Sequence, residues 1–151
     1  MLRFDAVQAD FEFDGSLRDI YVQNTSTLDW QACLEALKHS RFQLKYQRDG
    51  VVAPTPRDAI EAFSLVGLVS QLLTVYVDGL DLNCHFFSST EIEFDFDPRC
   101  VRDQRALDGL IEFMTLIVEA TGKPAIVTPE NMASFTIIRL APGSVPEHVH
   151  A

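Results

Sequence analysis

This sequence has no long apolar run, few cysteines and few basic residues. No stretch of about 18 consecutive apolar residues occurs, so we expect no membrane-spanning helix and no membrane partner. Residues 1–15 alternate Phe with acidic residues and lack the basic and apolar regions of a signal peptide, so we do not expect export through one. The cysteines are far apart and never in C-x-x-C spacing, which argues against a disulfide framework or a zinc finger: Cys33, Cys84 and Cys100. We therefore expect a reduced, cytoplasmic setting.

Basic residues are too few to balance the acidic ones. The chain has 12 Lys and Arg against 22 Asp and Glu, which gives a formal net charge of −10. Such a charge repels phosphate backbones, so we expect no nucleic-acid partner. The imbalance is concentrated in residues 76–97, which contain no Lys or Arg and six acidic residues: Asp78, Asp81, Glu91, Glu93, Asp95 and Asp97.

Familiar catalytic and cofactor-binding motifs are also missing. The sequence contains no G-x-G-x-x-G fingerprint, no G-x-S-x-G elbow and no H-E-x-x-H helix motif. Gly122-Lys123 is followed by Pro124, which does not fit a Walker loop. The sequence therefore indicates no cofactor and names no reaction.

What the chain does contain is enough apolar material for one compact domain. Its 151 residues are 47% hydrophobic, too many for a disordered acidic chain. We expect a single α+β domain over residues 1–141 and a C-terminal loop over 142–151. The expected architecture is a two-layer sandwich, in which a largely antiparallel sheet of about six to eight strands carries two to three helices on one face.

Periodicity predicts the elements of the first half of the chain. Alternating polar and apolar residues predict strands over 3–13 and 17–24, joined by an Asp-Gly turn. Ser26, followed by apolar residues at helical spacing, predicts a helix over 27–39. A third strand, residues 42–46, ends at a second Asp-Gly pair.

Two further helices and the last strands follow from capping residues. Thr55-Pro56 predicts the start of a helix over 56–65, and Asp97-Pro98 predicts the start of a long helix over 98–121. Gly122 suits the end of that helix. The final strands are expected over 124–127 and 135–140, separated by a helical turn that Thr128-Pro129 begins.

Residues 72–97 predict a three-stranded meander with a defined register. With Asp78-Gly79 as a two-residue turn, Val75 faces Leu82, and with residues 88–90 as the next turn, Cys84 faces Phe94. This register places apolar residues of all three strands on one face, and a slip of one residue would break that face.

The opposite face of the meander is polar and is the first candidate site. His85 is expected opposite Glu93, Asn83 opposite Asp95, and Asp81 opposite Asp97. The simplest interpretation is a solvated sheet face, whose alternating acids keep the Phe residues between them pointing inward. Partner recognition and metal binding are the two functional alternatives.

We interpret the chain as a non-enzymatic protein-interaction domain that binds a basic protein partner. The residues expected to make contact are acidic and lie on the sheet face or on a strand that could extend it: Asp10, Glu12, Asp81, Glu91, Glu93 and Asp95. Neutralisation of a basic toxin, as bacterial immunity proteins do, is one concrete version, suggested by size and charge alone. A homodimer is left open.

The alternative is a small metal-dependent hydrolase. Carboxylates and an imidazole could converge on Mn²⁺ or Zn²⁺, or place a general base beside an acid. The residues of this alternative would be Asp81, His85, Glu93 and Asp95. It ranks second because an exposed sheet lacks the concave pocket that enzymes usually need.

A second candidate site is the basic triplet Arg99, Arg102 and Arg105 at the predicted start of the long helix. These cations could hold a phosphate at the helix N-terminus. Ion pairs with nearby acidic residues are the favoured interpretation.

Overall fold

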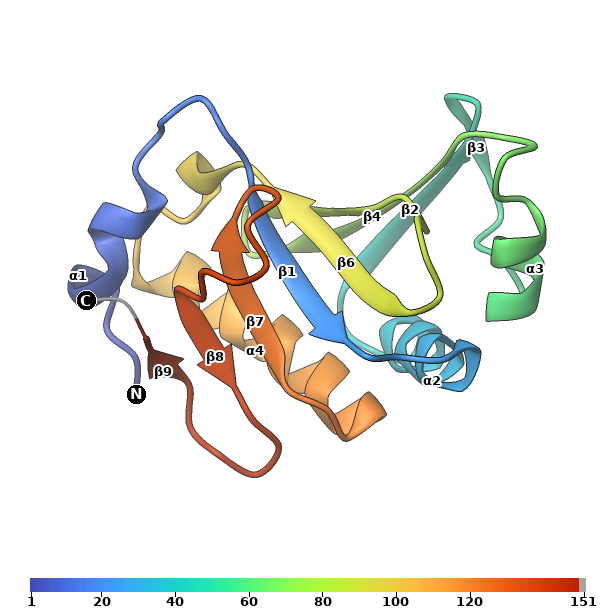
Figure 1. Cartoon of the computed structure of the whole chain (residues 1–151). Helices are drawn as coiled ribbons and strands as arrows, with labels where there is room; N and C mark the ends of the chain where they lie inside the picture. Colours follow the sequence, from blue (N-terminus) through green and yellow to red (C-terminus); the bar gives the residue numbers. More distant parts are fainter. Residues whose placement is uncertain (150–151) are drawn as a thin grey trace.

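The protein is an α+β fold built on one antiparallel sheet. In the computed structural model, which describes residues 1–149, the strand order is β3-β2-β4-β5-β6-β1-β7-β8-β9 (Figure 1). The nine strands exceed the expected six to eight by one. Their bounds are Arg18–Gln23 (β1), Gln43–Arg48 (β2), Val51–Ala53 (β3), Gln71–Val77 (β4), Leu80–Cys84 (β5), Glu91–Phe96 (β6), Ala125–Pro129 (β7), Ile138–Leu140 (β8) and Glu147–His148 (β9).

Helices cover one face of this sheet. The two long helices, α2 and α4, pack against each other behind the strands, as Figure 1 shows. The helical segments are Phe4–Val7 (α1), Gln8–Phe11 (the 3₁₀ helix η1), Thr27–Lys38 (α2), Ala59–Ser64 (α3), Pro98–Cys100 (the 3₁₀ helix η2) and Gln104–Thr121 (α4). Within the described part of the chain, no helix combines the length and the hydrophobicity that a membrane crossing requires. The expected two-layer α+β arrangement is thus confirmed.

The core lies between α4 and the apolar face of the meander. Leu82, Phe94, Leu110 and Met114 are all buried in it, and the rings of Phe94 and Phe113 meet edge to face at 5.0 Å. Because the apolar stripe of α4 matches the apolar alternation of β4 to β6, both surfaces are removed from water together.

The meander has the predicted register. Val75 pairs with Leu82 across β4 and β5, and Asn83 pairs with Asp95 across β5 and β6. The β5–β6 pairing is short because β5 ends at Cys84, just before Phe86, whose φ of 57° is incompatible with a strand. On its other side β6 pairs along its whole length with β1.

The predicted strand over 3–13 is wrong. This segment forms α1 and η1, and it buries Val7 and Phe11, which are four residues apart as on one face of a helix. Gly15 therefore lies in a loop before β1 and not in a hairpin turn. β1 pairs with β6 and β7 and not with residues 3–13, and Asp19 faces Asp95.

Two helices begin later than predicted. The long helix starts at Gln104, after Asp103, whose side chain accepts a hydrogen bond from the Ala106 N–H. Pro98 begins only the short η2, and Gly122 ends α4 at a φ of 69° as expected. The helix predicted over 56–65 is α3, which Asp58 caps. The helix over 27–39 and its Ser26 cap are confirmed.

The C-terminal segment also differs from the prediction. Residues 128–129 belong to β7, and a turn with Asn131 at a φ of 59° follows in place of the expected helical turn. The strand expected over 135–140 is confined to β8. The expected loop over 142–151 contains β9, which pairs with β8 at the sheet edge, and its residues 150–151 lie outside the described part of the chain.

Candidate functional site

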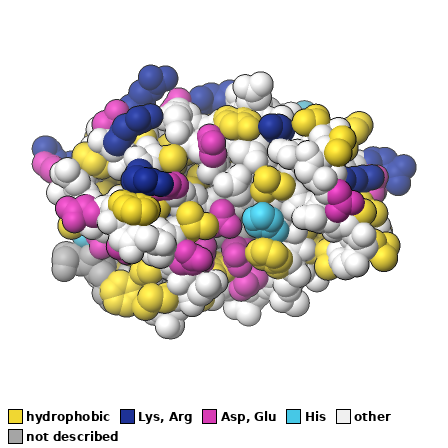
Figure 2. All heavy atoms as spheres, turned by 90° about the horizontal axis from the view of Figure 1, so that it is seen from above, with side chains coloured by type: hydrophobic (Ala, Val, Ile, Leu, Met, Phe, Trp, Pro, Cys, Tyr) yellow, Lys and Arg dark blue, Asp and Glu magenta, His cyan; other side chains and the backbone are white. Residues whose placement is uncertain are grey.

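Four carboxylates gather on two adjacent central strands of the sheet, on the face opposite α2 and α4. Asp19 comes from β1, and Glu91, Glu93 and Asp95 come from β6; we call these four residues the acidic cluster. The apolar neighbours of these residues along each strand point into the core, so strand alternation places the carboxylates outside it. Figure 2 shows acidic side chains beside a histidine near the middle of the surface seen from above.

Strand pairing brings these carboxylates close together. Asp19 faces Asp95 directly, while Tyr21 faces Glu93. Directly opposed side chains on neighbouring antiparallel strands have Cβ atoms about 4.5–5.5 Å apart. Four acidic groups thus share a small area of surface.

Asp19 is buried and held by two donors. The Tyr21 hydroxyl donates to Asp19 Oδ2 at 3.0 Å, and the backbone N–H of Asn131 donates to the same oxygen at 2.8 Å. The turn after β7 therefore closes over this end of the cluster. The sequence does not identify Asp19 as a member of this cluster, because its strand is predicted to pair with residues 3–13. The available signal is its alternation with Tyr21 and Gln23.

Burial makes the charged forms of Asp19, Glu93 and Asp95 costly. Burial raises the pKa of Glu93 from 4.5 to about 7, and the charges of Asp19, Glu91 and Asp95 add to the effect. Burial also raises the pKa of Asp19 despite its two donors. It raises the pKa of Asp95 as well, although the nearby His85 acts in the opposite direction.

Cations do not balance this cluster. Within residues 1–149, the carboxylates of Glu91 and Glu93 take part in no hydrogen bond or ion pair. His85 Nε2 lies 3.8 Å from Asp95 Oδ2. Among the described residues, this is the one ion pair between a basic side chain and the acidic cluster.

Lys45 and Arg139, which lie on other strands of the sheet, are farther away. Following the cross-strand pairs, Lys45 is separated from Asp95 by Thr74 and Asn83. Arg139 is separated from Glu93 by Ile126 and Tyr21. With neighbouring strands about 4.8 Å apart, the backbones of the two residues in each pair are roughly 14 Å apart. This distance is longer than a Debye length in physiological salt.

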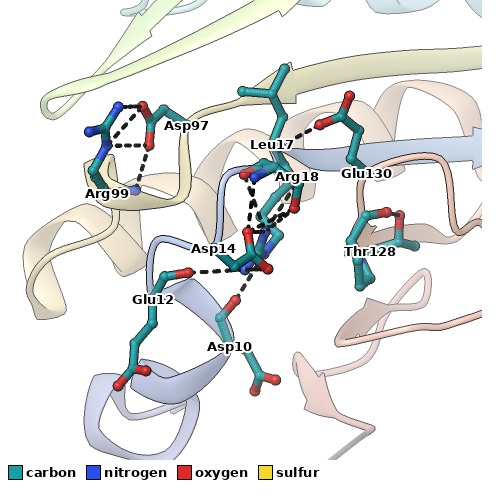
Figure 3. Close-up of polar contacts among 11 residues, drawn as sticks. Asp10, Glu12, Asp14, Leu17, Arg18, Asp97, Arg99, Thr128 and Glu130 are labelled. Carbon is teal, nitrogen blue, oxygen red and sulfur yellow. Dashed lines mark hydrogen bonds and ion pairs between the residues drawn. The ribbon is translucent and has the colours of Figure 1, made fainter.

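The start of β1 is held in place by a buried arginine, Arg18 (Figure 3). The Arg18 guanidinium donates to the carbonyl oxygens of Asp10 at 2.9 Å and Glu12 at 3.2 Å, and it contacts the Asp14 carboxylate at 3.3 Å. The Leu17 N–H donates to Glu130 Oε1 at 2.7 Å. These bonds anchor the chain just before Asp19 and so position it in the sheet.

Two residues of the predicted acidic surface lie elsewhere. Asp10 belongs to η1, where its Oδ2 lies 2.9 Å from His148 Nε2, and Glu12 directly follows η1. Neither is part of the sheet, so the expectation that they extend the acidic strands is wrong. Asp81 is exposed on β5, opposite Tyr76.

The metal set is not assembled. Among residues 1–149, no group of three or more His, Cys, Asp or Glu side chains is placed to hold a metal ion. His85 contacts Asp95, but its ring stacks on Phe87 at a centroid distance of 5.1 Å. The geometry thus gives no support to a site made of Asp81, His85, Glu93 and Asp95.

Two of the three arginines of the basic triplet form ion pairs, the interpretation that the sequence favours. Arg99 Nη2 lies 2.6 Å from Asp97 Oδ2 (Figure 3), and Arg105 Nη2 lies 3.7 Å from Asp78 Oδ1. Arg99 precedes α4, so it does not line the N-terminus of that helix. These contacts account for the charges of both arginines without a phosphate.

Comparison with known proteins adds no relative: no family model matches the sequence, and no curated protein or solved structure matches the chain. Function is therefore inferred from the geometry of the acidic cluster.

Proposed function

We propose that this protein is a non-enzymatic interaction domain that binds a basic protein partner through its acidic sheet face. The observation that carries this proposal is the Glu93 carboxylate, which is partly buried among three other carboxylates and has no cation partner among the described residues. A lysine or arginine from a partner would replace this repulsion with attraction. The same contact would return the pKa of Glu93 toward its ordinary value.

A protein is the partner class that best suits the shape and charge of this face. The cluster lies on the central strands of a nine-stranded sheet, a broad surface rather than an enclosed pocket. Protein interfaces of standard size cover about 800 Å² on each partner and tolerate such open surfaces. The net charge of −10 disfavours nucleic acid, and two copies meeting through the acidic cluster would repel each other.

Neutralisation of a basic toxin in a bacterial cytoplasm is the specific form that we favour. The three cysteines are free, which supports a reducing compartment. Opposite fields would speed association, as a rapidly acting inhibitor needs, and would make its rate dependent on salt.

The test uses amide variants of Glu91 and Glu93 and leaves Asp95 unchanged. The Asp95 side chain is only 17% exposed, so Lys in its place would disturb the sheet. A partner recovered by pull-down is followed by stopped flow with the wild type and with Glu91→Gln/Glu93→Gln. We expect the association rate to fall about three- to tenfold in the variant and the wild-type rate to fall as salt rises.

The matched control removes two charges elsewhere. At about pH 8, above the raised pKa of Glu93, Asp108→Asn/Glu119→Gln changes the net charge equally, but both residues are exposed on α4, on the other side of the sheet. This variant should keep at least half of the wild-type rate. Equal losses in the two variants would show a net-charge effect only, and unchanged rates in both would refute the acidic-face proposal.

A further inference from the structure

A hollow opens beside the acidic cluster. It has a volume of about 220 Å³ and lies between residues 66–71 and residues 85–87. Val66, Val69, Phe86 and Phe87 supply its apolar lining, and His85 forms part of its wall. The same His85 contacts Asp95, so the hollow and the cluster are continuous.

The rim of this hollow exposes apolar side chains. Phe87 is 66% exposed and Leu68, in the facing loop, is 76% exposed. Phe86 turns inward instead, where it packs against Trp30 with the ring centroids 5.4 Å apart. Phe86 is 1% exposed, so the two consecutive rings lie on opposite sides of the chain, one in the core and one at the surface.

A second exposed phenylalanine on this chain indicates which chemistry suits such a surface. Phe13 is 59% exposed, and the Arg99 guanidinium lies over its ring with the Cζ atom 4.2 Å from the centroid. The same guanidinium binds Asp97. One arginine thus makes a cation–π contact with a phenylalanine ring and an ion pair with a carboxylate at the same time. Around Phe87 the ring and the carboxylates are present, but no arginine of residues 1–149 lies over this ring.

We propose, on the basis of the proposed function, that the partner docks an extended basic segment here. An apolar side chain of that segment enters the hollow beside Phe87, and an arginine two positions away reaches Glu93 and Asp95. Same-side residues of an extended chain are about 6.6 Å apart, somewhat more than the spacing of about 4.8 Å between β5 and β6, and the long arginine side chain accommodates the difference. The negative charge of the cluster selects the basic residue, and the apolar lining of the hollow selects its neighbour.

Two synthetic peptides test this inference directly on the whole protein. The first is acetyl-Gly-Leu-Gly-Arg-Gly-Arg-Gly-amide, and the second has Ser in place of Leu. Binding is followed at low salt by backbone amide NMR shifts and by the fluorescence of Trp30, the one tryptophan, which contacts Phe86. We expect the Leu peptide to bind roughly tenfold more tightly than the Ser peptide.

Matched variants assign that difference to the hollow. Phe87→Ser should reduce the advantage of the Leu peptide to less than twofold, while Phe13→Ser, which removes the other exposed ring, should retain it. Both rings are largely exposed, so both variants should fold, which their melting curves check.

The outcomes separate this inference from the proposed function. If both peptides bind equally and Glu91→Gln/Glu93→Gln weakens both, the hollow is not a docking site but the acidic cluster still binds basic chains. If the Leu peptide keeps its advantage in Phe87→Ser, the hollow is likewise excluded. If neither peptide binds at low salt, the inference and the basic-partner proposal fail together.

Discussion

At the scale of the residue, Glu93 is the carboxyl group whose environment most opposes ionisation. In the unfolded chain this carboxyl has its ordinary pKa of 4.5, whereas in the fold burial and like charges raise it to about 7. The folded protein therefore holds a proton more tightly than the unfolded chain. By linkage, the stability that this group contributes is complete below its unfolded pKa and is lost as the pH rises through its folded pKa.

We expect the free energy of unfolding to decrease between pH 4.5 and about pH 8, by about 1–2 kcal/mol from Glu93 after allowance for solvent screening. The raised pKa values of Asp19 and Asp95 act in the same direction. Glu93→Gln should flatten this dependence and stabilise the protein at about pH 8. Urea titrations at several pH values measure both effects, with Glu119→Gln as the exposed control. A decrease equally steep in Glu93→Gln would contradict the assignment.

At the scale of the element, the β4–β6 meander shows what a sequence can specify. Its register followed from one two-residue turn, Asp78-Gly79, and from apolar alternation that survives in only one alignment. Both are local signals. The partner of β6 on its other side is β1, about 70 residues away in the chain, and no local pattern identifies such a pairing.

Local sequence patterns gave wrong predictions where the same pattern fits two different elements. Val7 and Phe11 fit a strand by alternation and a helix by their spacing of four, and burial of both in α1 and η1 decided between the two. Asp97-Pro98 has the residues that typically begin a helix, but the long helix α4 begins after its N-cap residue, Asp103. Three of the four members of the acidic cluster were predictable, and Asp19 was not, because its place depends on the β1–β6 pairing.

Phe94 tests the core side of this meander. It is buried on β6 and meets Phe113 of α4, so its truncation leaves a cavity between sheet and helix. We expect Phe94→Ala to reduce the free energy of unfolding by about 3–5 kcal/mol. Phe87→Ser, at an exposed ring on the opposite face, should cost less than about 1 kcal/mol. A loss well under 1 kcal/mol for Phe94→Ala in chemical denaturation would contradict the packing.

At the scale of the whole molecule, charge of one sign is the dominant electrostatic feature. Ion pairs such as Arg41–Glu112 are exposed and contribute little. Repulsion within a chain of net charge −10 is summed over many groups and is screened by salt.

We therefore expect the melting temperature to rise when NaCl is increased from about 10 mM to 500 mM at about pH 8. Calorimetry at several salt concentrations measures the rise. Glu91→Gln/Glu93→Gln should show a smaller rise than Asp108→Asn/Glu119→Gln, although both carry the same net charge, because only the first pair relieves the cluster. Equal rises would indicate net charge without a local contribution.

The position of the acidic cluster on the β1–β6 seam has a kinetic consequence. The meander can close through short loops, whereas β1 must find β6 across about 70 residues, and such distant pairings form slowly. Asp19 meets Glu93 and Asp95 only at that moment, so the repulsion opposes the slowest closure rather than the early collapse. Repulsion between these carboxylates therefore slows the step that completes the sheet. Glu93→Gln should refold faster than the wild type in stopped-flow refolding at about pH 8.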